Sequence, residues 1–135
     1  MKQLVVIDGQ GGGMGKQLIA AIKAAHPQFS ITAVGTNAIA TAAMIKAGAD
    51  KAATGSNAVV VACRTADVIV GPVGIVIADA LMGEMTQEMA AAVGRSPARK
   101  LLLPFNACGC VVVGAQELSL GALVRQTVAL LDEMG

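Results

Sequence analysis

Short apolar runs alternate along the chain with segments whose apolar residues recur at helical spacing. Each run is too short for a buried helix and is typical of a buried strand. The predicted strands are Gln3–Ile7, Ile31–Val34, Asp50–Thr54, Asp67–Val70, Leu101–Phe105 and Cys110–Val113. The segments between them predict helices from Met14 to His26-Pro27, from Asn37 to Ala47, from Ser56 or Asn57 to Thr65, from Thr86 to Gly94, and from Ser119 to the end.

Two segments keep an alternative. The run Val59-Val60-Val61 also allows a strand inside the third predicted helix, and Gly74–Met82 fits a strand or a helix. Asp79 and Glu84 would approach the carboxyl edge of the sheet only if Gly74–Met82 formed a helix.

Strands that are apolar on both faces and alternate with amphipathic helices are typical of a parallel sheet covered on both sides. We therefore expect an α/β fold: a three-layer, Rossmann-like, doubly wound and mainly parallel sheet. The expected strand order is 3-2-1-4-5, with Cys110–Val113 as an additional edge strand. A length of 135 residues suits a single domain that spans residues 1–135.

A glycine-rich turn follows the first strand and leads into the first helix. Its sequence is Asp8-Gly9-Gln10-Gly11-Gly12-Gly13-Met14-Gly15-Lys16. Such a turn places backbone N–H groups at a helix N-terminus, where they can bind a phosphate. A lysine in the first helical turn opposes the helix dipole, so Lys16 is more easily explained if it serves an anion. The alternative is that the glycines only allow close packing of the helix on the sheet.

Known phosphate loops match this turn only in part. The pattern G-x-G-x-x-G fails in every register, whereas G-x-x-G-x-x-G fits at Gly9, Gly12 and Gly15, as in some NADP-binding Rossmann proteins. A Walker loop needs a Ser or Thr where Gln17 stands, so we do not expect ATP hydrolysis. A side chain at Gly12 is expected to occupy the space of the ligand.

Other candidate ligand contacts lie at the ends of neighbouring strands, because ligands of such sheets bind where strands one and four diverge. They are Thr36 and Asn37 after strand two, Gly71, Pro72 and Gly74 after strand four, and Asn106 after strand five. Strand two ends without the acid typical of NAD binders and without the nearby arginine typical of NADP binders. Asn37 is also a natural helix cap, and Asp8 can bind the amides of its own loop.

Composition excludes several function classes. A net charge of +1 and 1% aromatic residues argue against nucleic-acid binding, and no apolar stretch is long enough for a membrane span. Hydrophobic residues make up 55% and charged residues 14%, which predicts that part of the surface is buried in a homo-oligomer. Cys108-Gly109-Cys110 is a C-x-C pair, whereas Cys63 and His26 lie on different elements, so we expect buried core cysteines and no metal site. An odd number of cysteines also predicts a reducing, cytoplasmic location. We expect His26 to cap helix carbonyls.

The chain resembles a family of short bacterial Rossmann-like proteins of uncharacterised function, which are grouped as nucleotide-binding. The resemblance is in Asp8-Gly9-Gln10-Gly11-Gly12-Gly13, in Gly71–Asp79 and in Leu118-Ser119-Leu120. It implies a fold and a family, but no reaction and no catalytic residues. Three functions follow as hypotheses: a binder of a nucleotide or other phosphorylated small molecule, a small NAD(P)-dependent oxidoreductase, or a structural protein whose glycine loop only packs.

Overall fold

Five parallel strands form one sheet in the computed structural model, which describes residues 2–105 and 109–134. The strands are β1 (Gln3–Asp8), β2 (Ser30–Gly35), β3 (Lys51–Thr54), β4 (Val68–Pro72) and β5 (Arg99–Leu103). Their order in the sheet is β3-β2-β1-β4-β5. The predicted fold class and strand order are therefore confirmed, and β1 and β4 lie side by side at the centre.

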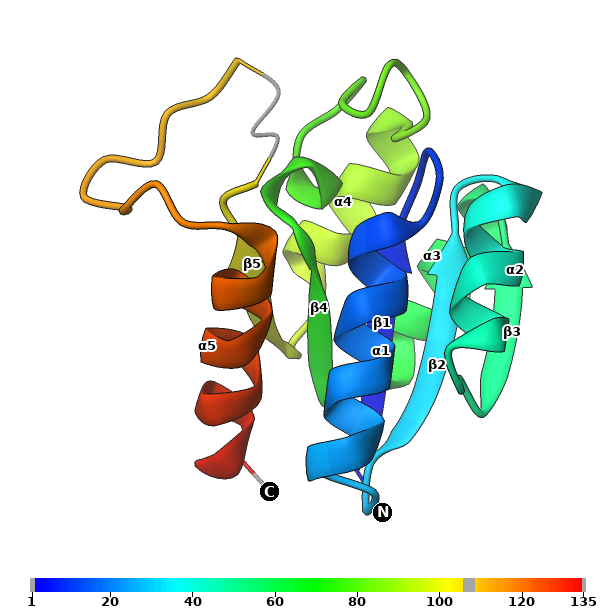
Figure 1. Ribbon diagram of the computed structural model, residues 1–135. Coiled ribbons are helices and arrows are strands. Elements are labelled where there is room, and N and C mark those ends of the chain that lie inside the picture. Colours follow the sequence, from blue (N-terminus) through cyan, green and yellow to red (C-terminus); the bar gives the residue numbers. More distant parts are fainter. Residues whose placement is uncertain (1, 106–108, 135) are drawn as a thin grey trace.

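Helices cover both faces of this sheet (Figure 1). One face carries α1 (Gly13–Ala25), α2 (Ala38–Lys46) and α5 (Leu120–Asp132), and the other carries α3 (Ser56–Thr65) and α4 (Gln87–Arg95). Strand β1 divides its side chains between two cores, because successive residues of a strand point to opposite faces. Leu4 and Val6 pack toward α1, whereas Val5 and Ile7 pack toward α3 and α4.

Helix starts agree largely with the sequence. Asn37 caps α2 by accepting from the N–H of Ala40 at 2.9 Å. Thr86 caps α4, and Ser119 caps α5. Residues 56–65 form a helix rather than a strand, but Gly55 precedes it and neither Ser56 nor Asn57 is its cap.

The prediction of an additional edge strand at Cys110–Val113 is wrong. This segment is irregular, and Val111 and Val113 are 88% and 94% exposed. Ala115 N donates to the carbonyl of Val112 in a turn, and β5 is the edge strand of the sheet. Three consecutive valines favour an extended strand only where a neighbouring strand accepts them.

The segment after β4 is neither strand nor α-helix. It begins as a short 3₁₀ helix, η1 (Val73–Val76), and continues as turns to the start of α4. Asp79, Leu81 and Met82 all have positive φ, between 58° and 66°. Non-glycine residues rarely adopt this conformation, which explains why apolar periodicity could not predict it.

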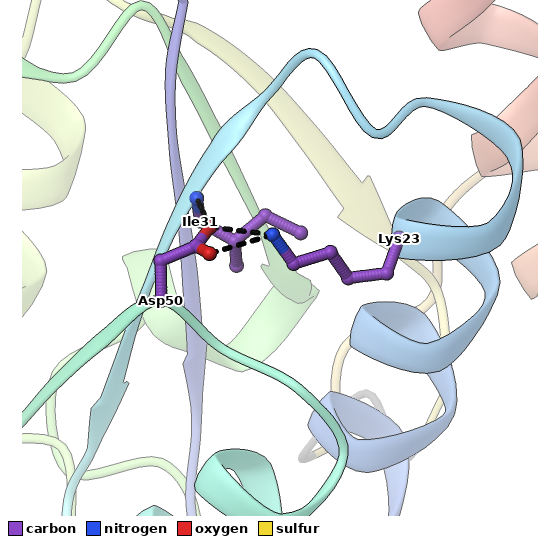
Figure 2. A network of polar contacts seen from close by, with 3 residues as sticks. All are labelled: Lys23, Ile31 and Asp50. Carbon is purple, nitrogen blue, oxygen red and sulfur yellow. Dashed lines mark hydrogen bonds and ion pairs between the residues drawn. The ribbon is translucent and has the colours of Figure 1, made fainter.

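Polar contacts at the amino ends of the strands tie α1 to the sheet (Figure 2). Both carboxylate oxygens of Asp50 lie 2.7 Å from Lys23 Nζ, and one also accepts from Ile31 N at 2.8 Å. These contacts hold the pKa of Asp50 below its usual value, with Lys23 the largest cause. His26 is the C-cap residue of α1, as expected, and its backbone N–H donates to the carbonyl of Ile22 at 2.7 Å. Its Nε2 lies 3.1 Å from the carbonyl of Val128 in α5.

None of the described helices is both long and apolar enough to span a bilayer.

Candidate functional site

The glycine loop lies at the carboxyl end of β1, on the edge where β1 and β4 lead into opposite layers. Gly12 has φ 75° and precedes α1, and its N–H donates to the carbonyl of Gly9 at 2.9 Å. This tight turn starts α1 directly at the carboxyl edge of the sheet. In parallel α/β sheets, ligands bind at this edge.

Three glycines of the loop are required by packing. A Cβ on Gly9 would collide with Thr36 Oγ1, and one on Gly15 would collide with Met44 of α2. A Cβ on Gly12 would lie 2.9 Å from Ala40 Cα, also in α2. The space beside Gly12 therefore belongs to α2, not to a ligand as the sequence suggested. The register Gly9, Gly12 and Gly15 that resembles an NADP loop is the set that packing explains.

Gly11 and Gly13 differ from these three. A Cβ on either would meet no atom within 4 Å, and neither has a positive φ. Both line a cavity of about 220 Å³ beside the loop. Its other walls come from the loop, from α1 and from four further segments: Asp8, Gly9, Gln10, Gly12, Met14, Gln17, Pro72, Leu81, Phe105 and Leu120. The cavity thus combines exposed loop backbone with a mainly apolar opposite side.

Asp8 is the charged side chain on this cavity's wall. It is 6% exposed, and its Oδ2 accepts from Gly15 N at 2.7 Å, so it caps the start of α1. Burial raises the pKa of Asp8, and the nearby Glu84 charge adds to the rise, while the N–H groups of Gly15 and Gly9 oppose it. The loop's own amides therefore engage Asp8, as the sequence allowed.

Glu84 closes the β2 side of the loop. Its Oε1 accepts from Thr36 Oγ1 at 2.6 Å, from Asn37 Nδ2 at 2.8 Å and from Gln10 N at 2.8 Å. These bonds lower the pKa of Glu84, with the Thr36 hydroxyl the largest cause. Glu84 reaches this place from a turn, although a helix seemed necessary. Thr36 and Asn37 thus contact Glu84 rather than the cavity.

The structure brings together only part of the predicted ligand set. The loop from Asp8 to Met14 and Pro72 line one cavity. Gly71 packs against the carbonyl of Ile7, and Gly74 is buried in η1. Gly15 is buried, and Lys16 is exposed and does not line the cavity. Asn106 lies outside the described residues.

Four wall residues were missed by sequence reasoning: Gln17, Leu81, Phe105 and Leu120. Two had a usable signal. Gln17 follows Gly13 by one helical turn and so shares its face, and Phe105 follows a strand at the same edge as the loop. Leu81 and Leu120 had none, because only the tertiary path of their segments brings them there.

The cysteines divide by environment. Cys63 is buried as expected, and burial raises its pKa to about 11. Cys110 is exposed, so its expected burial is wrong, and Cys108 lies outside the described residues. Within residues 2–105 and 109–134, no three His, Cys, Asp or Glu side chains are grouped so that they could hold a metal ion.

Comparison with known proteins adds the family. A model of a domain of unknown function, DUF3842, matches residues 3–134. The chain belongs to the DUF3842 family. No curated protein matches it. Among solved structures it is similar to a dodecameric FMN-dependent UbiX-like decarboxylase from Escherichia coli O157:H7, with 16% identity and a TM-score of 0.44 over 100% of this chain and 94% of the other. A likeness of this degree carries no information about ligand or assembly.

Proposed function

We propose that this DUF3842 protein binds a nucleotide or another phosphorylated small molecule in the cavity beside the glycine loop. The observation that carries the proposal is the open side of Gly11 and Gly13. Packing accounts for Gly9, Gly12 and Gly15, but it requires no glycine at these two positions. Glycine there leaves the loop backbone bare along a cavity at the sheet's ligand-binding edge. A loop that only packs would not need them.

Backbone amides would hold the anion. Because the N–H groups of Gln10, Gly12 and Gly15 already donate to Glu84, Gly9 and Asp8, the amides of Gly11 and Gly13 are the ones that would contact it. The start of α1 adds a partial positive charge, and Gln17 adds a side-chain amide on the same wall. Lys16, in the first turn of α1, would add a longer-range positive charge.

An NAD(P)-dependent oxidoreductase fits this site less well. A cavity of about 220 Å³ is smaller than the ~300–1,000 Å³ typical of cofactor pockets. Thr36 and Asn37, the candidate ribose contacts, are already bonded to Glu84. The space therefore favours a phosphate with its adjoining group over a complete dinucleotide.

Gly13→Leu is expected to weaken ligand binding by more than about tenfold without loss of stability. Leucine finds open space there and suits a helix, but it covers loop backbone that the ligand would contact. Titration with inorganic phosphate, mononucleotides and NAD(P) measures the effect, with melting temperature recorded in parallel. Gly94→Leu is the matched control, because Gly94 also has open space and lies in α4 away from the cavity. If the parent protein binds none of these compounds, the proposal is wrong.

We also propose that the chain forms a homo-oligomer through the β3 edge. All four residues of β3 are exposed, and only Lys51 among them is charged. On α2, Thr41 Oγ1 lies 2.7 Å from Thr54 Oγ1 of β3. Ile45, one turn after Thr41 and 53% exposed, therefore lies on the same side. An edge strand with an exposed, mostly uncharged row of residues is a template for pairing with another strand.

A second copy is the partner that this edge fits. Antiparallel pairing of two β3 strands across a two-fold axis would bring α2 to its own copy on one face and α3 to its own copy on the other. Such an interface needs roughly 800 Å² from each partner. Free Cys63 is consistent with the reducing, cytoplasmic location that we propose for this assembly.

Light scattering at micromolar concentration is expected to give a mass above the 13.5 kDa of one chain. Ala52→Glu should shift the protein toward the monomer, because it places a charge on the edge strand. Ala20→Glu is the matched control, since Ala20 is an exposed alanine on α1. A stable monomer for the parent protein would contradict oligomerisation, and an Ala52→Glu protein that assembles normally would place the interface elsewhere.

A further inference from the structure

A cavity of about 440 Å³ lies between α3 and α4, and it is twice the size of the one beside the glycine loop. Its volume lies within the ~300–1,000 Å³ typical of small-molecule sites. Cys63 and Arg64 line it near the end of α3, and Arg95 and Ser96 line it at the end of α4. In a parallel α/β sheet these helix ends lie opposite the carboxyl edge, so the cavity is remote from the glycine loop.

Two arginines face this cavity from different helices. The ion pairs found within residues 2–105 and 109–134 are Lys23–Asp50 and His26–Asp132, so neither Arg64 nor Arg95 has a carboxylate partner there. A cation near a helix C-terminus is favoured by the dipole by only ~0.3–1 kcal/mol. That preference explains one cation at each helix end, but it does not explain a cavity left open between two of them.

Glu88 and Lys100 make the charge of the cavity differ between its two ends. Glu88 also lines the cavity, but it precedes Arg95 by seven residues, which is roughly 10 Å along a helix. Lys100 donates from Nζ to the carbonyl of Ser96 at 2.6 Å and so adds positive charge beside the arginine end. One end of the cavity is therefore basic and the other end holds a single carboxylate.

The floor of the cavity is apolar. Val60 and Ala92 contribute aliphatic groups, and the raised pKa of Cys63 keeps its thiol neutral at physiological pH. The Ser96 hydroxyl donates to the carbonyl of Cys63 at 2.7 Å and accepts from Ala98 N at 3.2 Å. The floor thus offers a mainly apolar contact surface, on which the Ser96 hydroxyl has no hydrogen left to donate to a ligand.

We propose that the groove between α3 and α4 is a second ligand site, for a small organic anion with a compact apolar body. The anionic group would lie at the arginine end, where guanidinium groups bind carboxylates and phosphates through paired N–H donors. The apolar body would lie on the floor between the helices. This site shares no residue with the glycine-loop cavity and does not depend on the function proposed for it.

Titration of the full chain followed by amide NMR tests the proposal. Hexanoate and hexyl phosphate are the anionic probes, and hexanamide is the neutral control with the same apolar body. We expect saturable shifts at Cys63, Arg64 and Arg95 with at least one anion, and at least about tenfold weaker binding of hexanamide. The anion that binds more tightly identifies the head group as carboxylate or phosphate.

Three variants make the result decisive. The double variant Arg64→Gln/Arg95→Gln should lose about tenfold or more in affinity, and Ala91→Phe should block the groove from its exposed rim. Arg125→Gln should bind normally, because Arg125 is an exposed arginine on α5. Melting temperatures identify any variant that fails to fold, and each of the two groove changes tests the site by itself. No saturable binding of either anion, equal binding of hexanamide, or full affinity in the double arginine variant would overturn the proposal.

Discussion

Gly12→Val is expected to lower the free energy of unfolding by about 3 kcal/mol or more, the largest effect of any loop substitution. Gly12 has φ 75°, a conformation that costs a β-branched residue heavily. Its Cβ would also lie 2.9 Å from both the Cα and the carbonyl oxygen of Ala40. These are backbone atoms of α2, so the clash is relieved only by moving a helix.

Gly11→Ala is the matched control for this variant. Gly11 is the neighbouring residue, it has no positive φ, and its Cβ would meet no atom within 4 Å. Its unfolding free energy is expected to stay within about 0.5 kcal/mol of the parent. Urea denaturation of the three proteins measures both effects. Equal stability of the two variants would show that α2 does not pack against the loop as described.

Asp8→Ala is expected to destabilise the protein by about 1–3 kcal/mol. The substitution removes the carboxylate that accepts from Gly15 N at 2.7 Å and leaves that buried donor without a partner. It also opens a void beside β1, where Asp8 is buried. Asp8→Asn keeps an acceptor oxygen of the same shape, so its stability at neutral pH should remain close to that of the parent or exceed it.

The pH dependence separates the charge of Asp8 from its shape. Because burial raises the folded pKa of Asp8 above the ordinary 3.8, the folded protein keeps this proton where the unfolded chain has lost it. Stability from Asp8 is therefore complete below pH ~3.8 and declines as pH rises through the folded pKa. Asp8→Asn should remove that decline in denaturation curves measured from pH 4 upward. The lowered pKa of Glu84 has the opposite effect, because the stability that Glu84 contributes is lost as pH falls. Asp8→Asn retains Glu84 and therefore retains this second pH dependence. A parent and variant with parallel pH profiles would contradict the raised pKa.

Binding measured with the same pair of proteins tests the chemistry of the glycine-loop site. Asp8→Asn removes a negative charge from the cavity wall, so a phosphorylated ligand held by amides should bind more tightly to this variant than to the parent. Weaker binding would instead mean that the carboxylate itself contacts the ligand, through a hydroxyl or a bound cation.

Sequence patterns determined the layers and the strand order, because both follow from local periodicity and from the rules of parallel connections. The apolar runs of β1 and β4 and the caps Asn37, Thr86 and Ser119 are features of short segments. Asp8 and its glycine loop could be placed at the ligand-binding edge for the same reason, since that edge follows from the end of the first strand.

Tertiary structure alone decided which glycines are needed for packing and which leave space. Gly11 and Gly12 are adjacent and identical in sequence, yet only Gly12 faces α2, a helix about thirty residues away whose approach no local pattern encodes. The same reason applies to Glu84, whose three hydrogen bonds join segments 74, 48 and 47 residues distant. It applies equally to Arg64 and Arg95, which face one cavity only because α3 and α4 pack together. Periodicity indicates which face of one helix or strand is buried. These sites depend instead on how several helices and strands approach one another, and the packing of the whole core fixes that approach.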